Sequence, residues 1–147
     1  MTRDVKDRLR EGRLYQSHYY DDAALDQAAE ILGRVKAEKI ETIRMVFPDQ
    51  HGIFRGKTVT TLALESALSA GIGMPSTLLL KDTSHRTVFP VWSEDVSLGD
   101  QPLTGASDIV CAPVVDSFRP VPWSPHSAFL ICDVLHRSGE RIPVSSR

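Results

Sequence analysis

Cysteine is scarce in this sequence, and long apolar runs are missing. Among its 147 residues there are two cysteines, Cys111 and Cys132, and neither belongs to a Cys-x-x-Cys type of motif. Both stand in apolar segments, which predicts buried free thiols in a reducing compartment. No apolar run reaches the roughly 20 residues of a membrane helix, and the first residues are charged rather than apolar. These features predict a cytoplasmic protein without a membrane partner.

An excess of basic residues is also lacking. The formal net charge is -2, which argues against a nucleic-acid partner. The arginines and lysines of residues 1–20 alternate with acidic residues, and this predicts a solvated, partly disordered N-terminal arm. His18, His51 and His136 have no ligand spacing, so we predict no metal site within the chain.

The segment "HGIFRGKT", residues 51–58, has some features of a phosphate-binding loop but not its spacing. Such a loop needs four residues between its first glycine and the Gly-Lys-Thr, and Gly52 and Gly56 enclose only three. Polar and apolar residues alternate in the run before this segment, and the chain after its turn has the pattern of a returning strand. Residues 40–60 are therefore predicted to form a β-hairpin. Its glycines are then expected to take positive φ angles in a tight turn, with Arg55 and Lys57 exposed or paired with Asp49. The alternative is that this loop contacts another subunit in an assembled enzyme.

The periodicity of the remaining chain predicts an α+β protein. Residues 21–38 begin with two aspartates and then repeat apolar residues at helical spacing, which indicates an amphipathic helix. A second helix is expected between Thr60 and Gly71, followed by an apolar strand in "STLLLKD" (residues 76–82). Residues 81–107 form a long polar connection, and further strands are expected at 108–114 and 127–135. We therefore predict that residues 39–147 form a β-grasp, a mixed sheet with one crossing helix, preceded by the N-terminal amphipathic helix.

Four segments between residues 38 and 147 resemble the N-terminal domain of glutamine synthetases. They are "DQHGIFRGK", "LESALSAGIGM", "DIVCAPVVDSFRPVPW" and "AFLICDVLHRSGERIP", and they occur in the order found in that family. The residues that match the family pattern in the first and third segments include Asp49, Gly52, Arg55, Gly56, Lys57, Asp116, Arg119 and Trp123.

The resemblance implies an ATP-dependent carboxylate–amine ligase. Such enzymes phosphorylate the glutamate side chain, an amine then displaces the phosphate, and magnesium or manganese ions neutralise the phosphate charge. In the family this domain closes the amine end of a neighbouring subunit's active site in a homo-oligomeric ring. The metal ligands and most ATP contacts belong to a C-terminal catalytic domain that these 147 residues lack. We therefore expect the isolated chain to be inactive and to hold no cofactor of its own.

The chain departs from the family pattern where ammonia is bound. Ammonia-using members have Phe-Asp-Gly-Ser-Ser after the second helix, and the resemblance places Pro75 at the aspartate, with Ser76 and Thr77 keeping the hydroxyls. A cation in a partly closed site needs a carboxylate partner, so the resemblance implies an amine larger than ammonia. Asp82 and His85 are candidates for binding that amine or removing its proton, and a polar surface loop is the alternative for them. The alternative hypothesis for the function is that the chain is a free-standing, non-catalytic β-grasp interaction module.

Overall fold

Two short helices occupy the region where the sequence predicted a partly disordered arm. The computed structural model describes residues 4–88, 90–92, 97–98, 101–102, 107–142 and 145. Within them α1 spans Val5–Arg10 and α2 spans Arg13–Gln16. Each helix buries one leucine, Leu9 and Leu14, in the main core. The interleaved charges therefore form the outer surface of a folded segment, and the apolar residues between them decide its structure.

The predicted N-terminal helix is present as α3, Asp22–Ala37. Its N-cap is Asp21, whose carboxylate accepts a hydrogen bond of 2.8 Å from the backbone nitrogen of Ala24. Its buried stripe consists of Leu25, Ala28, Ile31 and Val35. The cap and the 3–4 spacing of the stripe explain both where this helix begins and which side faces the core.

A mixed sheet follows, as predicted. Its main strands run in the spatial order β2-β1-β8-β6-β3, and β7 pairs with β8. β1 and β8 are parallel, whereas every other pair in this sheet is antiparallel. α4 (Thr61–Ala70) crosses from β2 to β3. The strands are β1 Thr42–Pro48, β2 Phe54–Thr60, β3 Ile72–Pro75, β6 Asp108–Pro113, β7 Arg119–Val121 and β8 Ser124–Leu135. This arrangement confirms the β-grasp prediction.

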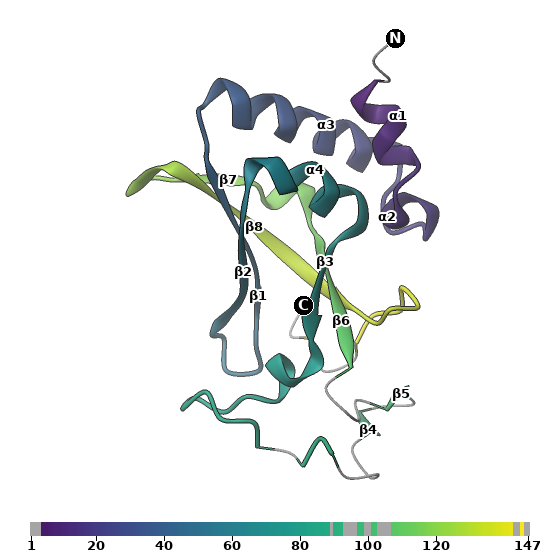
Figure 1. Ribbon diagram of the computed structural model, residues 1–147, viewed down its shortest axis with the longest axis vertical. Helices are drawn as coiled ribbons and strands as arrows, with labels where there is room; N and C mark the ends of the chain where they lie inside the picture. The colour runs from purple at the N-terminus through teal and green to yellow at the C-terminus, as the bar shows by residue number, and fades with distance from the viewer. Residues whose placement is uncertain are drawn as a thin grey trace.

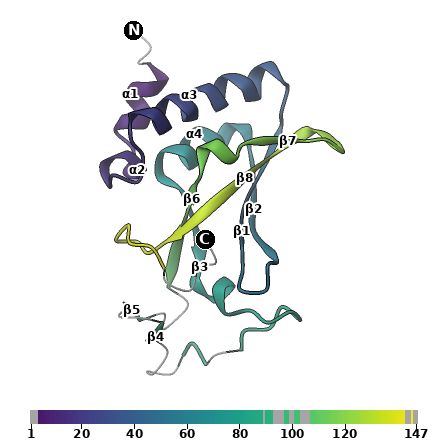
Figure 2. The same cartoon turned by 180° about the vertical axis from the view of Figure 1, so that it is seen from behind.

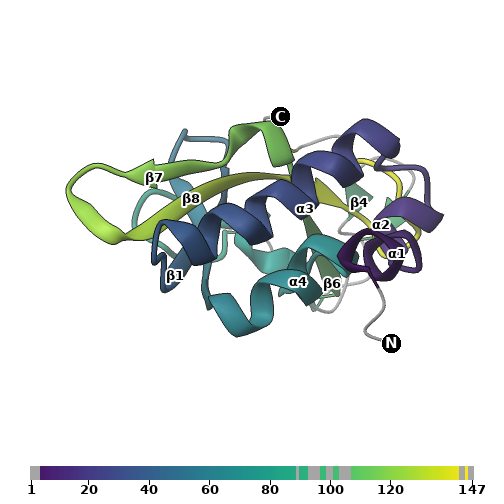
Figure 3. The same cartoon turned by 90° about the horizontal axis from the view of Figure 1, so that it is seen from above.

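Both long helices lie on one side of the sheet (Figures 1, 2 and 3). Alternate residues of β1, Ile43, Met45 and Phe47, are fully buried and belong to the same core cluster as α3 and α4. Arg44 lies between them and is exposed on the opposite face. The sheet thus has one covered face and one open face, as the period of two in a strand requires.

Residues 76–80 differ from their prediction as a strand. They form a 3₁₀ helix, η1, Ser76–Leu80, and the strand lies just before them as β3. Gly71 ends α4 with φ +74, and the next residue, Ile72, already pairs with Cys111. The chain therefore enters the sheet earlier than the apolar run indicated. A second 3₁₀ turn, η2, spans Val115–Ser117, and β4 (Ser97–Leu98) pairs with β5 (Gln101–Pro102) in a separate small sheet.

The two cysteines are buried free thiols, as predicted. Cys111 lies in β6 and Cys132 in β8. Burial raises the pKa of the Cys111 thiol to about 12 and raises that of Cys132 further above its ordinary value. Among the described residues, no helix is both long and apolar enough to cross a membrane.

Candidate functional site

The turn between β1 and β2 is built around the carboxylate of Asp49. One carboxylate oxygen accepts hydrogen bonds from the backbone nitrogens of His51 (2.8 Å) and Ile53 (2.9 Å). Gly52 sits between them with φ +75, a conformation that L side chains rarely adopt. The turn lies at the end of the sheet remote from α3 and α4 (Figure 1). An aspartate and a glycine three residues apart therefore fix its shape.

Arg55 forms a buried ion pair with the same carboxylate. Its Nε donates to the second oxygen of Asp49 at 2.8 Å, and the side chains are only 7% and 2% exposed. Burial alone would raise the pKa of Asp49, but hydrogen bonds from Ile53, Arg55 and His51 together outweigh it and hold that pKa below its ordinary value. Of the two predicted arrangements for Arg55, pairing with Asp49 is the one observed.

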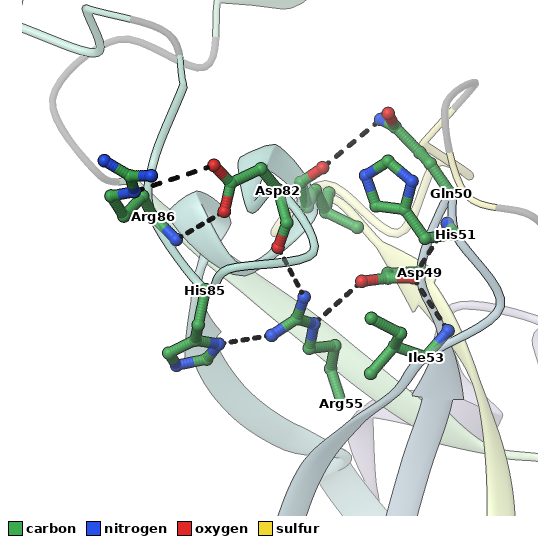
Figure 4. Close-up of polar contacts among 9 residues, drawn as sticks. Asp49, Gln50, His51, Ile53, Arg55, Asp82, His85 and Arg86 are labelled. Atoms are coloured by element: carbon green, nitrogen blue, oxygen red, sulfur yellow. Dashed lines mark hydrogen bonds and ion pairs between the residues drawn. The ribbon is translucent and has the colours of Figure 1, made fainter.

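The rest of the Arg55 guanidinium reaches across to the loop after η1 (Figure 4). Its Nη2 donates to the backbone oxygen of Asp82 at 3.3 Å, and its Nη1 contacts Nδ1 of His85. Because a guanidinium can only donate, Nδ1 of His85 must accept, and the imidazole hydrogen is on Nε2. His85 is held with φ 64, in the left-handed region. One arginine thus joins the hairpin to this loop and sets the tautomer of His85.

The Asp82 side chain is occupied mainly within its own loop. One carboxylate oxygen accepts a hydrogen bond of 2.8 Å from the backbone nitrogen of Arg86, and the other lies 3.9 Å from Nε of that arginine. The Asp82 side chain remains 34% exposed, so an oxygen can still be reached from solvent. Gln50 adds a second tie between hairpin and η1 by donating to the backbone oxygen of Leu79 at 3.2 Å. The loop is therefore ordered by its neighbours.

Gly56 differs from its predicted role in the turn, whereas Lys57 has one of its two predicted arrangements, exposure to solvent. Gly56 does not take a positive φ; it is a residue of β2, and a Cβ there would stand 2.0 Å from the backbone oxygen of Met45 in β1. The residue is needed for close approach of two strands rather than for a turn. Lys57 is exposed, and its Nζ donates to the backbone oxygen of Gly73 in β3 at 2.8 Å.

The structure separates the predicted amine-side residues into two groups. Pro75 ends β3 and is exposed, whereas Ser76 is fully buried, with its backbone nitrogen donating to Ser107 at 2.7 Å. Thr77 is half-buried in η1. Among the described residues, no hydrogen bond joins this group to Asp82 or His85. The Ser76 hydroxyl, 3.5 Å from the Ser107 hydroxyl, faces the interior and not a solvent-filled site.

The third family segment forms part of an exposed groove. Asp116 is in η2, and its backbone oxygen, with that of Phe118, accepts from Nη1 of Arg119. Trp123 is 81% exposed. The groove is about 420 Å³, and its remaining lining includes Arg44, Phe54 and Phe129, which the sequence reasoning missed. Alternation along β1, β2 and β8 is the signal that could have placed these three on the open face.

No family model matches the chain. Among curated proteins, the γ-glutamylanilide synthase of an Acinetobacter species is 26% identical over 136 residues, covering 90% of this chain and 27% of the relative. Type-1 glutamine synthetase 2 of Dictyostelium discoideum is 26% identical over 87% of the chain, and the glutamate–isopropylamine ligase of a Pseudomonas species is 28% identical over 77%. The chain spans about a quarter of the length of these relatives, with 24% of each of the last two covered.

Solved structures show the same fold. A structure described as GmaS in complex with ADP superposes with a TM-score of 0.57 at 23% identity, over 78% of this chain and 22% of the other. A glutamine synthase homologue gives a TM-score of 0.54 at 20% identity, over 72% of this chain and 24% of the other. The chain is therefore similar in sequence to glutamine synthetase-like ligases over most of its length, as its four segments predicted, and similar in fold to part of the solved structures.

Proposed function

We propose that this chain is the N-terminal domain of an ATP-dependent, glutamine synthetase-like carboxylate–amine ligase, where it forms the amine-side wall of a neighbouring subunit's active site. We further propose that the amine is larger than ammonia. The second part rests on Pro75, which the resemblance to the family places at the aspartate of ammonia-using members and which is exposed at the end of β3. Two of the relatives are named for ligating aniline and isopropylamine, which agrees with this proposal.

The contacts of the loop after η1 give its two polar residues different roles. Asp82 is the carboxylate that the loop offers to the amine nitrogen, because its side chain is one-third exposed. His85 accepts from Arg55 through Nδ1 and presents an N–H at Nε2, so in this state it cannot take a proton from the amine. We therefore assign His85 to positioning of the loop, and not to proton removal.

Magnesium or manganese would neutralise phosphate charge in such a ligase. The described residues contain no group of three or more His, Cys, Asp or Glu side chains that could hold a metal ion, so they do not fit this role. We accordingly assign this chain no step at the metal or at ATP. Its contribution is to shape the entrance through which the amine approaches and to exclude water from it.

The test is an amine panel on the protein at its natural length. ADP release would be measured with glutamate and ammonium, methylamine, isopropylamine, ethanolamine or aniline. We expect kcat/KM to be at least tenfold higher for one of the larger amines than for ammonium. The Pro75→Asp variant should lower the KM for ammonium, because it restores a carboxylate partner, while Pro125→Asp at another exposed proline should leave it unchanged.

Two results would count against the proposal. If the wild-type protein preferred ammonium, the proposal of a larger amine substrate would be wrong, but the proposal of a ligase would stand. Absence of ADP release with every amine, from a folded and soluble protein, would favour the non-catalytic interaction module instead.

A further inference from the structure

The open face of the sheet carries an apolar groove that the proposed ligase function does not use. It lies over β1, β2, β7 and β8, away from α3 and α4. Phe54 and Trp123 are 57% and 81% exposed in it. The groove is lined by Arg44, Phe54, Arg119, Pro120, Val121, Pro122, Trp123 and Phe129. Exposed aromatic side chains gathered in one place mark a binding surface more often than scattered ones do.

Strand register places two arginines on either side of one phenylalanine. Arg44 of β1 stands opposite Phe129 of β8, and Phe129 stands opposite Arg119 of β7. Directly opposed residues in neighbouring strands point to the same face, so the three side chains form a row across the sheet. Phe54 meets the ring of Phe129 edge-on, with 5.4 Å between ring centroids. The row therefore has an aromatic centre and a cation at each side.

These two cations are without a carboxylate in the part of the chain that the structure describes. Among the described residues, no ion pair involves Arg44 or Arg119, and the side-chain hydrogen bonds of Arg119 go to backbone oxygens. None of the described residues that line the groove is acidic. Trp, Phe and Arg together with few acidic residues are typical of the centre of a protein–protein interface. The groove is therefore complementary to an occupant that supplies both apolar surface and negative charge.

We propose that this groove binds an extended segment of a partner protein in which carboxylates flank an apolar side chain. The apolar side chain would pack on Phe54, Phe129 and Trp123, and the carboxylates would pair with the two guanidiniums, which favour bidentate contacts. An extended segment fits better than a small ligand because the aromatic residues are spread from β2 to the β7–β8 turn. That turn projects beyond the layer of helices, where a partner can reach it (Figure 3).

The primary experiment is selection from a displayed library of random 12-residue peptides on the immobilised 147-residue chain. We expect enrichment of peptides with Asp or Glu on both sides of an aromatic or aliphatic residue. For a selected peptide, Trp123→Ser and Arg44→Glu should each raise the Kd at least tenfold. Trp92→Ser is the matched control, since that tryptophan is 80% exposed and lies outside the groove. Binding should also weaken as salt is raised.

Other outcomes would overturn the proposal. Failure to enrich any peptide, enrichment of basic peptides, or equal binding by wild type and Trp123→Ser would each do so. Sedimentation of the chain tests a second copy as the occupant, because a dimer lost in Trp123→Ser would assign the face to self-association. Tight binding of oligo-dT lost in Arg44→Glu would assign it to a single-stranded nucleic acid. None of these results depends on Pro75 or on ligase activity, so the ligase proposal is tested separately.

Discussion

The two strands of the β1–β2 hairpin differ in which side chains they bury. On the covered face, Ile43, Met45 and Phe47 are wholly buried under the helices. On the hairpin's return strand, the neighbours Phe54 and Arg55 are reversed: the phenylalanine is 57% exposed, while the arginine is 7% exposed. The covered face is thus explained by folding alone. The reversed pair is not, because burying a charge and exposing an aromatic ring both oppose stability unless another contact compensates.

The compensation differs between the two reversed residues. Arg55 finds its partners inside the chain: the Asp49 carboxylate, the Asp82 backbone oxygen and His85. Phe54 has one aromatic contact among the described residues, with the ring of Phe129, and most of its surface stays in water. The buried charge therefore belongs to the architecture of the hairpin and the loop after η1, whereas the exposed ring belongs to a surface that is completed by something else.

The largest expected effect is on the covered face. Phe47→Ala should lower the free energy of unfolding by about 3–5 kcal/mol, since it leaves a cavity in a closely packed core. Chemical denaturation with a fixed m-value would measure the loss. A loss below about 1 kcal/mol would show that the helices do not hold this face closed.

The second effect concerns the buried ion pair. Arg55→Met should lower the free energy of unfolding by about 3 kcal/mol, because it leaves Asp49 charged and buried with only its backbone hydrogen bonds. Denaturation of this variant, of Asp49→Asn and of the double variant would be measured as a double-mutant cycle. If the two single losses simply add, then the two side chains do not interact as the structure shows.

The third effect is a pH dependence. The pKa of Asp49 is lower in the folded chain than in the unfolded chain, so the unfolded chain binds more protons at low pH. The stability that this group contributes is fully present above the unfolded aspartate value of roughly 3.9 and is lost as the pH falls toward the lower folded value. When the free energy of unfolding is measured from pH 6 downward, it should therefore decrease less steeply with falling pH for Asp49→Asn than for wild type. Parallel curves would contradict this account.

The smallest effect is expected on the open face. Trp123→Ser should change the free energy of unfolding by no more than about 0.5 kcal/mol, because the side chain is 81% exposed. The same denaturation experiment measures it beside Phe47→Ala. A large loss would mean that the tryptophan supports the fold, and the distinction between the two faces would then fail.

Local patterns in the sequence predicted the elements well where one pattern prevailed. The aspartates before residue 23 and the apolar stripe gave α3 its position, and alternation gave the β1–β2 hairpin. The apolar run at 76–80 was assigned wrongly, because three consecutive leucines fit a strand or a tight helix equally until the pairing of Ile72 is known. The arm of residues 1–20 was predicted from charge, which does not reveal that Leu9 and Leu14 meet the core.

The candidate site was only partly predictable, because its contacts join distant segments. Pairing of Asp49 with Arg55 follows from their positions on one hairpin and was among the expectations. The link from Arg55 to His85, thirty residues away, depends on how η1 packs on the turn, and no spacing in the sequence shows it. The row of Arg44, Phe129 and Arg119 likewise depends on the register of three strands.

Lys57 has a consequence for the behaviour of the chain in concentrated solution. It stands in β2, the strand at one end of the main sheet, and its ammonium is directed to a backbone oxygen of β3 at the other end. A strand at a sheet edge can otherwise recruit a strand from another molecule and begin aggregation, and a lysine there makes such pairing costly because its charge would be desolvated. We expect replacement of Lys57 by an apolar residue to remove its hydrogen bond to Gly73 and to increase aggregation of the protein.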